Sequence, residues 1–130
     1  MKWSLQQLYK YGKNIIPVST AYDFTEDIKN IDDILAISPA VVKGSGVNVR
    51  DDRFRFDLHI SVIMYLQDAK TLDSVEYPLE LDIVEIFDKE QYDDDTRLIE
   101  KNTIELRGIV WENIILQKPI RVVKDEIKQN

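Results

Sequence analysis

A long run of alternating residues constrains this chain more than any other feature. From Phe54 to Leu66 every second residue is apolar, and most of the residues between them are polar. Successive side chains of a β-strand point to opposite faces, so this run predicts a strand with one buried and one polar face. A second alternating run, from Val75 to Ile83, follows a polar segment short enough for a hairpin loop. We therefore expect an α+β fold with an antiparallel sheet built on a long central hairpin, with strands over about 54–66 and 75–87.

Two short segments disturb the strand pattern. Ile83 and Val84 are adjacent apolar residues, which reverses the phase of the second strand and predicts a β-bulge near Ile83. The segment Lys43-Gly44-Ser45-Gly46 lies within a strand expected over residues 40–50. No Gly-Lys-Ser/Thr follows these glycines, as a phosphate-binding loop requires, so we interpret them as a bulge or a kink in the strand.

Three segments are candidates for short helices. Residues 4–11 begin with Ser4, and Gln7 stands three positions later, which is the spacing of a capping box. Residues 24–37 carry apolar side chains at helical spacing, and we expect a surface helix that covers one face of the sheet. Residues 103–117 fit a helix in part, but a glycine and several β-branched residues leave a strand as an open alternative.

Shorter strands complete the expected sheet. Residues 15–21 are a candidate edge strand, because Pro17 interrupts them and proline is tolerated at an edge. Residues 98–104 predict the beginning of another short strand. A closing strand is expected near the C-terminus, at Ile120, Val122 and Val123.

Composition limits the class of protein. The 130 residues indicate a single domain, 1–130, and the absence of cysteine excludes disulfides, thiol catalysis and cysteine-based zinc sites. No apolar run approaches the roughly 18 residues of a membrane span, and the N-terminus lacks the apolar core of a signal peptide. We therefore expect a cytoplasmic protein. Its net charge of −7 repels free nucleic acid on average.

The titratable residues form no recognisable catalytic pattern. His59 is the single histidine, and no serine triad pattern accompanies it. Glu112 is best interpreted as a residue on a helix surface or one that bonds at a helix cap. The three aspartates at 93–95 lack the alternate ligands, the glycine and the distal glutamate of a calcium loop. We therefore expect no enzymatic activity, no metal site, no cofactor and no small-molecule substrate.

Five basic residues are candidates for contact with RNA phosphate or with another partner. Phe54 and Phe56 interleave with arginines of this set, but they share the phase of the apolar strand face, which favours the core over stacking on bases. The acidic loop 88–95 is the alternative contact, and it would hold a basic partner. The five candidates are Lys43, Arg50, Arg53, Arg55 and Lys70.

Several short segments, in a fixed order along nearly the whole chain, match the pattern of a known protein family. They are Met1-Lys2-Trp3-Ser4 with Leu8, Val42-Lys43-Gly44, Asp68-Ala69-Lys70-Thr71-Leu72, Tyr77-Pro78-Leu79, Ile104-Glu105-Leu106, Glu112-Asn113-Ile114-Ile115-Leu116 and Pro119. Together they resemble the YceD family, described as large ribosomal RNA subunit accumulation proteins.

The chain departs from this family's pattern at its cysteines. The family's hairpin loop reads cysteine, a small residue, arginine, cysteine or threonine, and leucine, whereas this chain has Asp68 at the first position and Lys70 at the third. Many members carry a further cysteine after the closing proline, where this chain has Val123 or Lys124. The resemblance therefore implies no metal or redox role for this chain.

The resemblance implies a bacterial factor for 23S ribosomal RNA accumulation and large-subunit assembly. It implies no catalytic residues, so the factor would act by binding RNA or a basic ribosomal protein. Two alternatives stay open: a metal-dependent RNA-processing enzyme, which needs carboxylates that converge from separate strands, and a plain protein-interaction module with a pairing sheet edge. The family-motif positions are Asp68, Ala69, Lys70, Thr71, Leu72, Glu112, Leu116 and Pro119.

Overall fold

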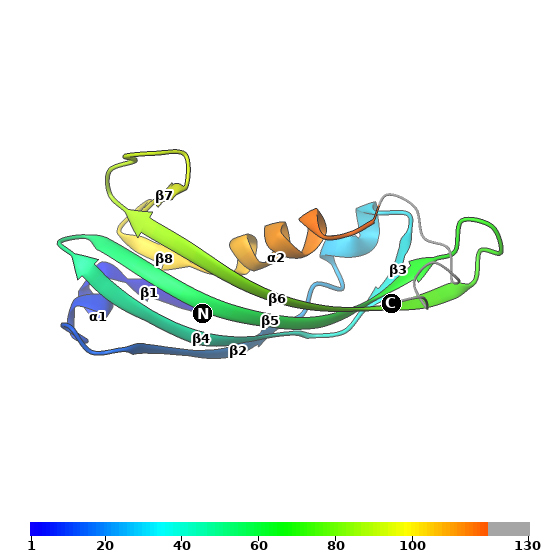
Figure 1. Ribbon diagram of the computed structural model, residues 1–130, viewed down its shortest axis with the longest axis horizontal. Helices are drawn as coiled ribbons and strands as arrows, with labels where there is room; N and C mark the ends of the chain where they lie inside the picture. The colour runs from blue at the N-terminus through cyan, green and yellow to red at the C-terminus, as the bar shows by residue number, and fades with distance from the viewer. Residues whose placement is uncertain (120–130) are drawn as a thin grey trace.

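The computed structural model describes residues 1–119 and is dominated by one curved sheet (Figure 1). Its strands run in the order β2, β4, β5, β6, β7, and β3 pairs with β5 beyond the end of β4. All neighbours are antiparallel except β6 and β7, which are parallel. The strands are β2 (Ile16–Tyr22), β3 (Ile34–Ile37), β4 (Ala40–Arg50), β5 (Arg53–Gln67), β6 (Ser74–Asp88) and β7 (Thr96–Leu98).

The predicted central hairpin is confirmed as β5 and β6. Their register is continuous from Phe54 opposite Phe87 to Gln67 opposite Ser74. The period of two places the apolar residues of β5 on one inward face, and Phe54 and Phe56 are fully buried there, as the sequence predicted. Figure 1 shows that this hairpin extends over the length of the sheet.

Short elements from both ends of the described chain cover the inward face. The strand β1 (Lys2–Ser4) pairs with β8 (Thr103–Glu105), and it places Trp3 against Phe56 with 5.4 Å between ring centroids. The helix α1 (Leu5–Tyr9) follows β1, and its predicted capping box is present between Ser4 and Gln7. The helix α2 (Arg107–Leu116) lies over the inward face and buries Ile109, Val110 and Ile114.

The glycine segment of β4 contains no bulge. The register between β4 and β5 is continuous from Val41 to Asn48, and it shifts only between Asn48 and Arg50, next to the turn. The glycines instead allow close approach, because a Cβ atom at Gly46 would lie 2.5 Å from the ring of Phe56. The prediction of a strand was right, and of the bulge or kink expected at the glycines, the bulge was wrong.

The expected bulge near Ile83 is also absent. β6 pairs with β5 in a single register, and the change of phase comes from the residue types instead. Val84 points to the outward face with 52% of its surface exposed, while Glu85 takes the inward position and is only 8% exposed. A buried carboxylate thus stands where the pattern called for an apolar residue.

The helix expected over residues 24–37 does not form. The segment contains the 3-10 turn η1 (Asp27–Asn30) and then β3, whose residues pair with Met64, Tyr65 and Leu66 of β5. Phe24 and Ile28 are buried, as the apolar spacing predicted, but Leu35 is 45% exposed. Pairing with the end of β5, which β4 does not reach, satisfies the backbone in place of helical hydrogen bonds.

Of the predictions for the other short segments, some are confirmed and one is wrong. The edge strand over 15–21 is confirmed as β2, which pairs with β4 and with no other strand among residues 1–119. The prediction of a strand over 98–104 is wrong, because Leu98 ends β7 and Thr103 begins β8. Residues 103–117 contain both alternatives, β8 and then α2. The closing strand predicted at Ile120, Val122 and Val123 lies outside the described residues.

Candidate functional site

The five basic candidates do not form one patch. Arg50 and Arg53 flank the turn between β4 and β5, and their guanidinium carbons lie 6.0 and 5.8 Å from the ring centre of Tyr92. Lys70 lies in the loop at the other end of β5. Because β5 spans Arg53–Gln67 and a strand rises about 3.3 Å per residue, roughly 50 Å separates the two ends.

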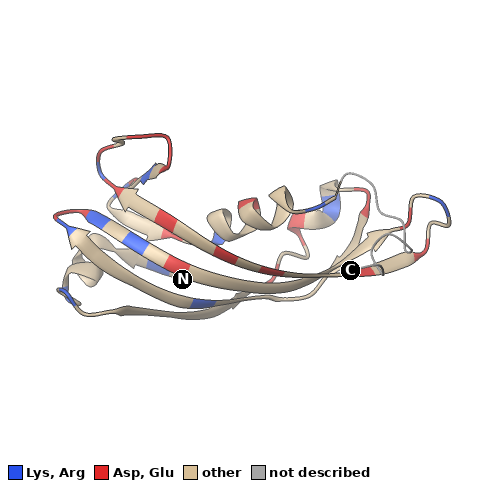
Figure 2. Cartoon of the chain, in the orientation of Figure 1, with Lys and Arg blue, Asp and Glu red and all other residues tan. Residues whose placement is uncertain are grey.

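Carboxylates lie close to the candidate arginines. Arg53 faces Asp88 at 3.5 Å, and this aspartate is only 7% exposed, so the acidic loop begins with a buried residue. Arg55 donates from Nε and Nη2 to both carboxylate oxygens of Asp57, at 3.1 and 3.0 Å. Figure 2 shows acidic bands on β5 and β6 beside these basic ones. Phosphate would have to compete with these carboxylates for both arginines.

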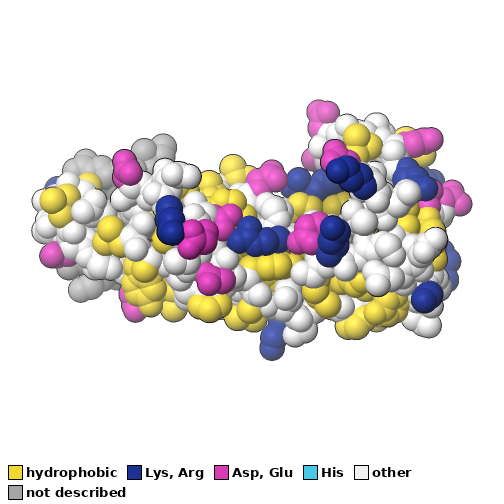
Figure 3. Space-filling model, turned by 180° about the vertical axis from the view of Figure 1, so that it is seen from behind, with side chains coloured by type: hydrophobic (Ala, Val, Ile, Leu, Met, Phe, Trp, Pro, Cys, Tyr) yellow, Lys and Arg dark blue, Asp and Glu magenta, His cyan; other side chains and the backbone are white. Residues whose placement is uncertain are grey.

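The view from behind leads to the same conclusion. Lysine and arginine side chains lie scattered there among acidic, hydrophobic and uncharged ones (Figure 3). Affinity for a nucleic acid backbone depends on several cations placed along one path. The described residues bring Arg50 and Arg53 together and leave Lys43, in the middle of β4, and Lys70 apart from them.

His59 lies between two carboxylates on the outward face of the sheet. Its Nδ1 lies 2.8 Å from Asp82, and its Nε2 lies 2.8 Å from Glu80, both on the neighbouring strand β6. The hydrogen bonds to Asp82, and then to Glu80, raise the pKa of the imidazole, because they favour its charged form. Lys43 stands opposite His59 on β4. The Ser61 hydroxyl also donates to Glu80, at 3.0 Å, so four groups form one polar ladder across the strands.

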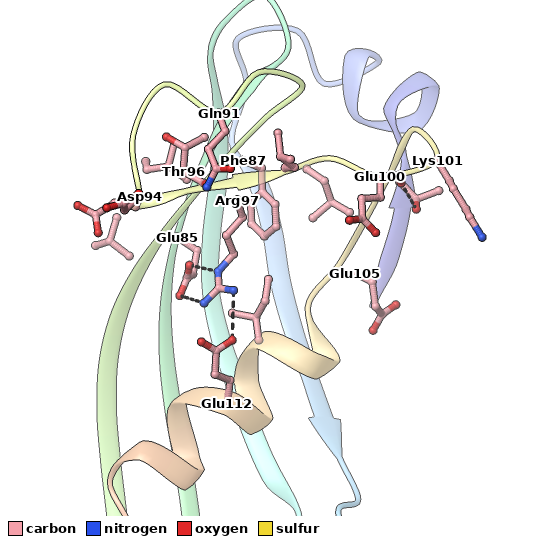
Figure 4. Close-up of a pocket in the computed structure, with 17 residues that line it drawn as sticks. Glu85, Phe87, Gln91, Asp94, Thr96, Arg97, Glu100, Lys101, Glu105 and Glu112 are labelled. Carbon is pink, nitrogen blue, oxygen red and sulfur yellow. Dashed lines mark hydrogen bonds and ion pairs between the residues drawn. The ribbon is translucent and has the colours of Figure 1, made fainter.

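A groove of about 990 Å³ opens where β6, β7, β8 and α2 meet (Figure 4). Arg97 of β7 reaches across it and donates from Nε to Glu85 at 2.6 Å and from Nη1 to Glu112 at 3.2 Å. These hydrogen bonds raise the pKa of the guanidinium, which remains charged. Glu112 is exposed on α2, as its sequence context predicted. The remaining charged residues that line the groove are mostly acidic: Asp94, Asp95, Glu100, Lys101 and Glu105.

Sequence reasoning missed the pairing of Glu85 with Arg97. Asn113 of α2 also donates to Glu85, at 3.3 Å, so three elements converge on this buried carboxylate. The available signal was the position of Glu85, which shares the inward phase of β6 with Ile83 and Phe87. An acid in that phase requires a cationic partner from elsewhere in the fold.

The family-motif residues lie at the hairpin tip and on α2. Asp68 is 2% exposed, and its Oδ1 accepts the backbone N–H groups of Lys70 and Thr71 at 2.8 and 3.0 Å. Leu72 adopts a left-handed backbone with φ of 66°, and its side chain is 63% exposed. The aspartate therefore organises the tip of the loop. On and beyond α2, Glu112 binds Arg97, Leu116 is 72% exposed and Pro119 is half-buried.

The carboxylates of β6 do not converge as a metal-dependent enzyme would require. Glu80 and Asp82 point outward from β6, whereas Glu85 points inward. Within residues 1–119, no group of three or more histidine or acidic side chains is placed to hold a metal ion. Over the same residues, no helix has the length and apolar character needed to cross a membrane.

The chain is similar to a bacterial protein over most of its length. A Bacillus subtilis (strain 168) protein described as uncharacterized protein YlbN is 33% identical over 126 residues, which cover 94% of this chain and 73% of YlbN. The chain belongs to the YlbN family. No protein-family model and no solved structure matches the chain. The identity with YlbN extends over nearly the whole chain.

Proposed function

We propose that this protein is a non-enzymatic factor for 23S ribosomal RNA accumulation, which acts in the cytoplasm by binding a basic protein of the large ribosomal subunit. The link with the large subunit is supported by the resemblance to the YceD family, whose ordered segments cover nearly the whole chain. The choice of a protein partner over RNA is supported by the charge distribution.

The charge distribution carries the proposal. Two of the five basic candidates, Arg53 and Arg55, already face carboxylates of the same chain, and Lys70 lies at the far end of the hairpin. Exposed acids, in contrast, follow the outward face of β6 and the rim of the groove. With a net charge of −7, this surface attracts a lysine- and arginine-rich partner and repels a phosphate backbone.

The test is capture of partners by the tagged full chain from bacterial lysate, with and without RNase and over a series of salt concentrations. We expect one basic large-subunit protein to remain bound after RNase treatment and to be released as salt rises. Capture of 23S ribosomal RNA that is lost steeply with salt would favour direct phosphate contact instead. Capture of neither would overturn the proposal.

A genetic readout complements the capture. Depletion of the protein in its host should lower the ratio of 23S to 16S ribosomal RNA and lead to accumulation of large-subunit precursors. A variant with Glu76→Gln and Glu105→Gln removes two exposed acids of the described surface, and it should restore the ratio less well than the natural chain. An unchanged ratio after depletion would contradict the proposed role.

A further inference from the structure

One side of β6 is open over most of its length. β5 pairs with β6 along the other side, from Ser74 to Phe87. On the open side β7 pairs only with Ile86–Asp88, so residues 74–85 have no neighbouring strand within residues 1–119. Figure 1 shows this edge between β7 and the hairpin tip. At about 3.3 Å per residue, the free edge is roughly 35 Å long.

The hydrogen bonds of Ile63 show which backbone groups face this edge. The N–H of Ile63 donates to Ser38 Oγ at 2.8 Å, and its carbonyl accepts the N–H of Ser38 at 2.9 Å, so both groups point away from β6. Pro78 stands opposite Ile63 and therefore directs its own backbone to the free side. In agreement, the carbonyl of Asp88, which has the same parity as Pro78, accepts the N–H of Ile99 on that side.

Even-numbered residues of β6 consequently present their backbone to the open edge. Pro78 offers only a carbonyl there, while its neighbours of the same parity offer both a donor and an acceptor. The side chains of these residues point to the outward face, where three of them are carboxylates. The residues with a donor are Ser74, Glu76, Glu80, Asp82 and Val84.

The inward side of the same edge is apolar. Tyr77, Leu81 and Ile83 are half-buried there, in contrast to the fully buried residues of β5. α2 lies over the same face, and its Asn113 donates to Glu85 at the end of this edge. A strand added to this edge would therefore find acidic residues on one face and partly exposed apolar residues on the other.

We infer that the free edge of β6 binds an extended basic segment of a protein partner as an added β-strand. Lysine or arginine at every second position would face Glu76, Glu80 and Asp82, and apolar residues between them would cover Tyr77, Leu81 and Ile83. Main-chain hydrogen bonds give such a complex its affinity, and alternate side chains give it specificity. The inference rests on the proposed function for the basic nature of the partner.

The same residues disfavour a second copy of this chain. Pairing two β6 edges would bring acidic outward faces next to each other, and Pro78 removes a donor from each edge. These features protect natural edges from self-association. They leave the edge open to a strand of opposite charge.

The test uses amide hydrogen exchange of the full chain, measured by NMR. The probe is a peptide of about ten residues that alternates lysine with valine, which matches the length of the free edge. We expect the probe to slow exchange at Glu76, Glu80, Asp82 and Val84. The odd-numbered residues of β6, whose amides already bond to β5, should not change. A peptide that alternates glutamate with valine is the control and should produce no protection.

Matched charge reversals locate the site. Glu76→Lys should weaken binding of the lysine peptide about five-fold, because each exposed charge contact contributes up to about a factor of five. Asp32→Lys reverses another exposed acid, which precedes β3 on the other side of β5, and should leave the affinity unchanged. Equal losses in both variants would indicate a general charge effect and overturn the inference.

Other results of the exchange experiment would identify a different site or a different occupant. Protection confined to groove residues 94–105 would place the peptide elsewhere and overturn the edge site. Protection of the even-numbered amides that grows with protein concentration, in the absence of peptide, would identify a second copy as the occupant. A positive peptide result together with failed capture of a ribosomal protein would keep the edge site and remove the proposed function, so the two can fail separately.

Discussion

Glu85 is a buried carboxylate that side chains of two other elements hold in place. It is 8% exposed on the inward face of β6, where Arg97 of β7 and Asn113 of α2 bond to it. A buried carboxylate without a cation is costly, so this pair couples the end of β6 to the groove wall. Glu112 completes the cluster from an exposed position and contributes less.

Removal of the cation should therefore be more harmful than removal of the exposed acid. We expect Arg97→Met to lower the free energy of unfolding by about 2 kcal/mol, because it leaves Glu85 buried without its cationic partner. Glu112→Gln should lower it by less than about 1 kcal/mol. Urea unfolding measures both values. Equal losses in the two variants would contradict the central role of Glu85.

His59 provides a prediction about pH. Its folded-state pKa is raised by Asp82 and Glu80, so the imidazole binds its proton more tightly in the folded than in the unfolded chain. The stabilisation is therefore complete below the unfolded pKa of about 6.5 and is lost as pH rises through the folded pKa. NMR titration should give a pKa above 6.5, and Asp82→Asn should lower it.

The corresponding stability measurement compares the natural chain with His59→Gln. The natural chain should have the larger advantage near about pH 6 and a smaller one near about pH 9. Glu80→Gln serves as the second partner variant and should also reduce the advantage at low pH. An advantage that grows with pH would contradict the ladder geometry.

A glycine in β4 and a glycine in α2 differ in the space around them. A Cβ atom at Gly44 of β4 would collide with the carbonyl oxygen of Asp57 and lie 2.9 Å from the Cα of Leu58, both in the backbone of β5. A Cβ atom at Gly108, in the first turn of α2, would meet nothing within 4 Å. The strand pair therefore needs its glycine for space, and the helix does not.

Alanine substitutions test this difference. Gly44→Ala should destabilise the protein by about 3 kcal/mol, because two paired backbones must separate to admit the methyl group. Gly108→Ala should stabilise it by about 0.5 kcal/mol, since alanine loses less conformational freedom in a helix. Thermal unfolding measures both. A stabilising effect at Gly44 would contradict the close approach of β4 and β5.

Some elements of the fold could be predicted from the sequence and others could not. The central hairpin and the capping box at Ser4 were predictable, because side-chain alternation and capping are local properties. The segment 24–37 was misassigned, because its apolar spacing suits a helix while the end of β5 offers a strand a pairing partner. The candidate site was predicted poorly for the same reason: Arg97 and Glu85 meet only in the folded chain.

The N-terminal segment connects distant parts of the molecule. β1 pairs with β8, Leu106 donates its N–H to the carbonyl of Met1 at 3.3 Å, and Trp3 stacks on Phe56. The terminal amine also donates to the Tyr22 hydroxyl, at 2.7 Å. The first residues therefore join the start of α2 to the sheet and cover one end of the core.

Loss of this cover should destabilise the molecule as a whole. Trp3→Ala should lower the free energy of unfolding by about 3 kcal/mol, because it opens a cavity above Phe56. Lys2→Ala changes an exposed neighbour in the same strand and should remain within about 0.5 kcal/mol of the natural chain. Urea unfolding measures both. A small effect of Trp3→Ala would show that the N-terminal strand does not contribute to the cooperative unfolding of the core.

The sequence by itself determined the long hairpin, its buried face and the acidic character of the chain. Alternation and composition are properties of each residue and its immediate neighbours, so they survive without knowledge of the fold. Only the tertiary structure decided that the candidate cations lie apart, that Glu85 is buried against Arg97, and that no strand of residues 1–119 covers the edge of β6 over residues 74–85. These features depend on which distant segments lie side by side, and strand pairing and charge burial establish that only when the chain has folded.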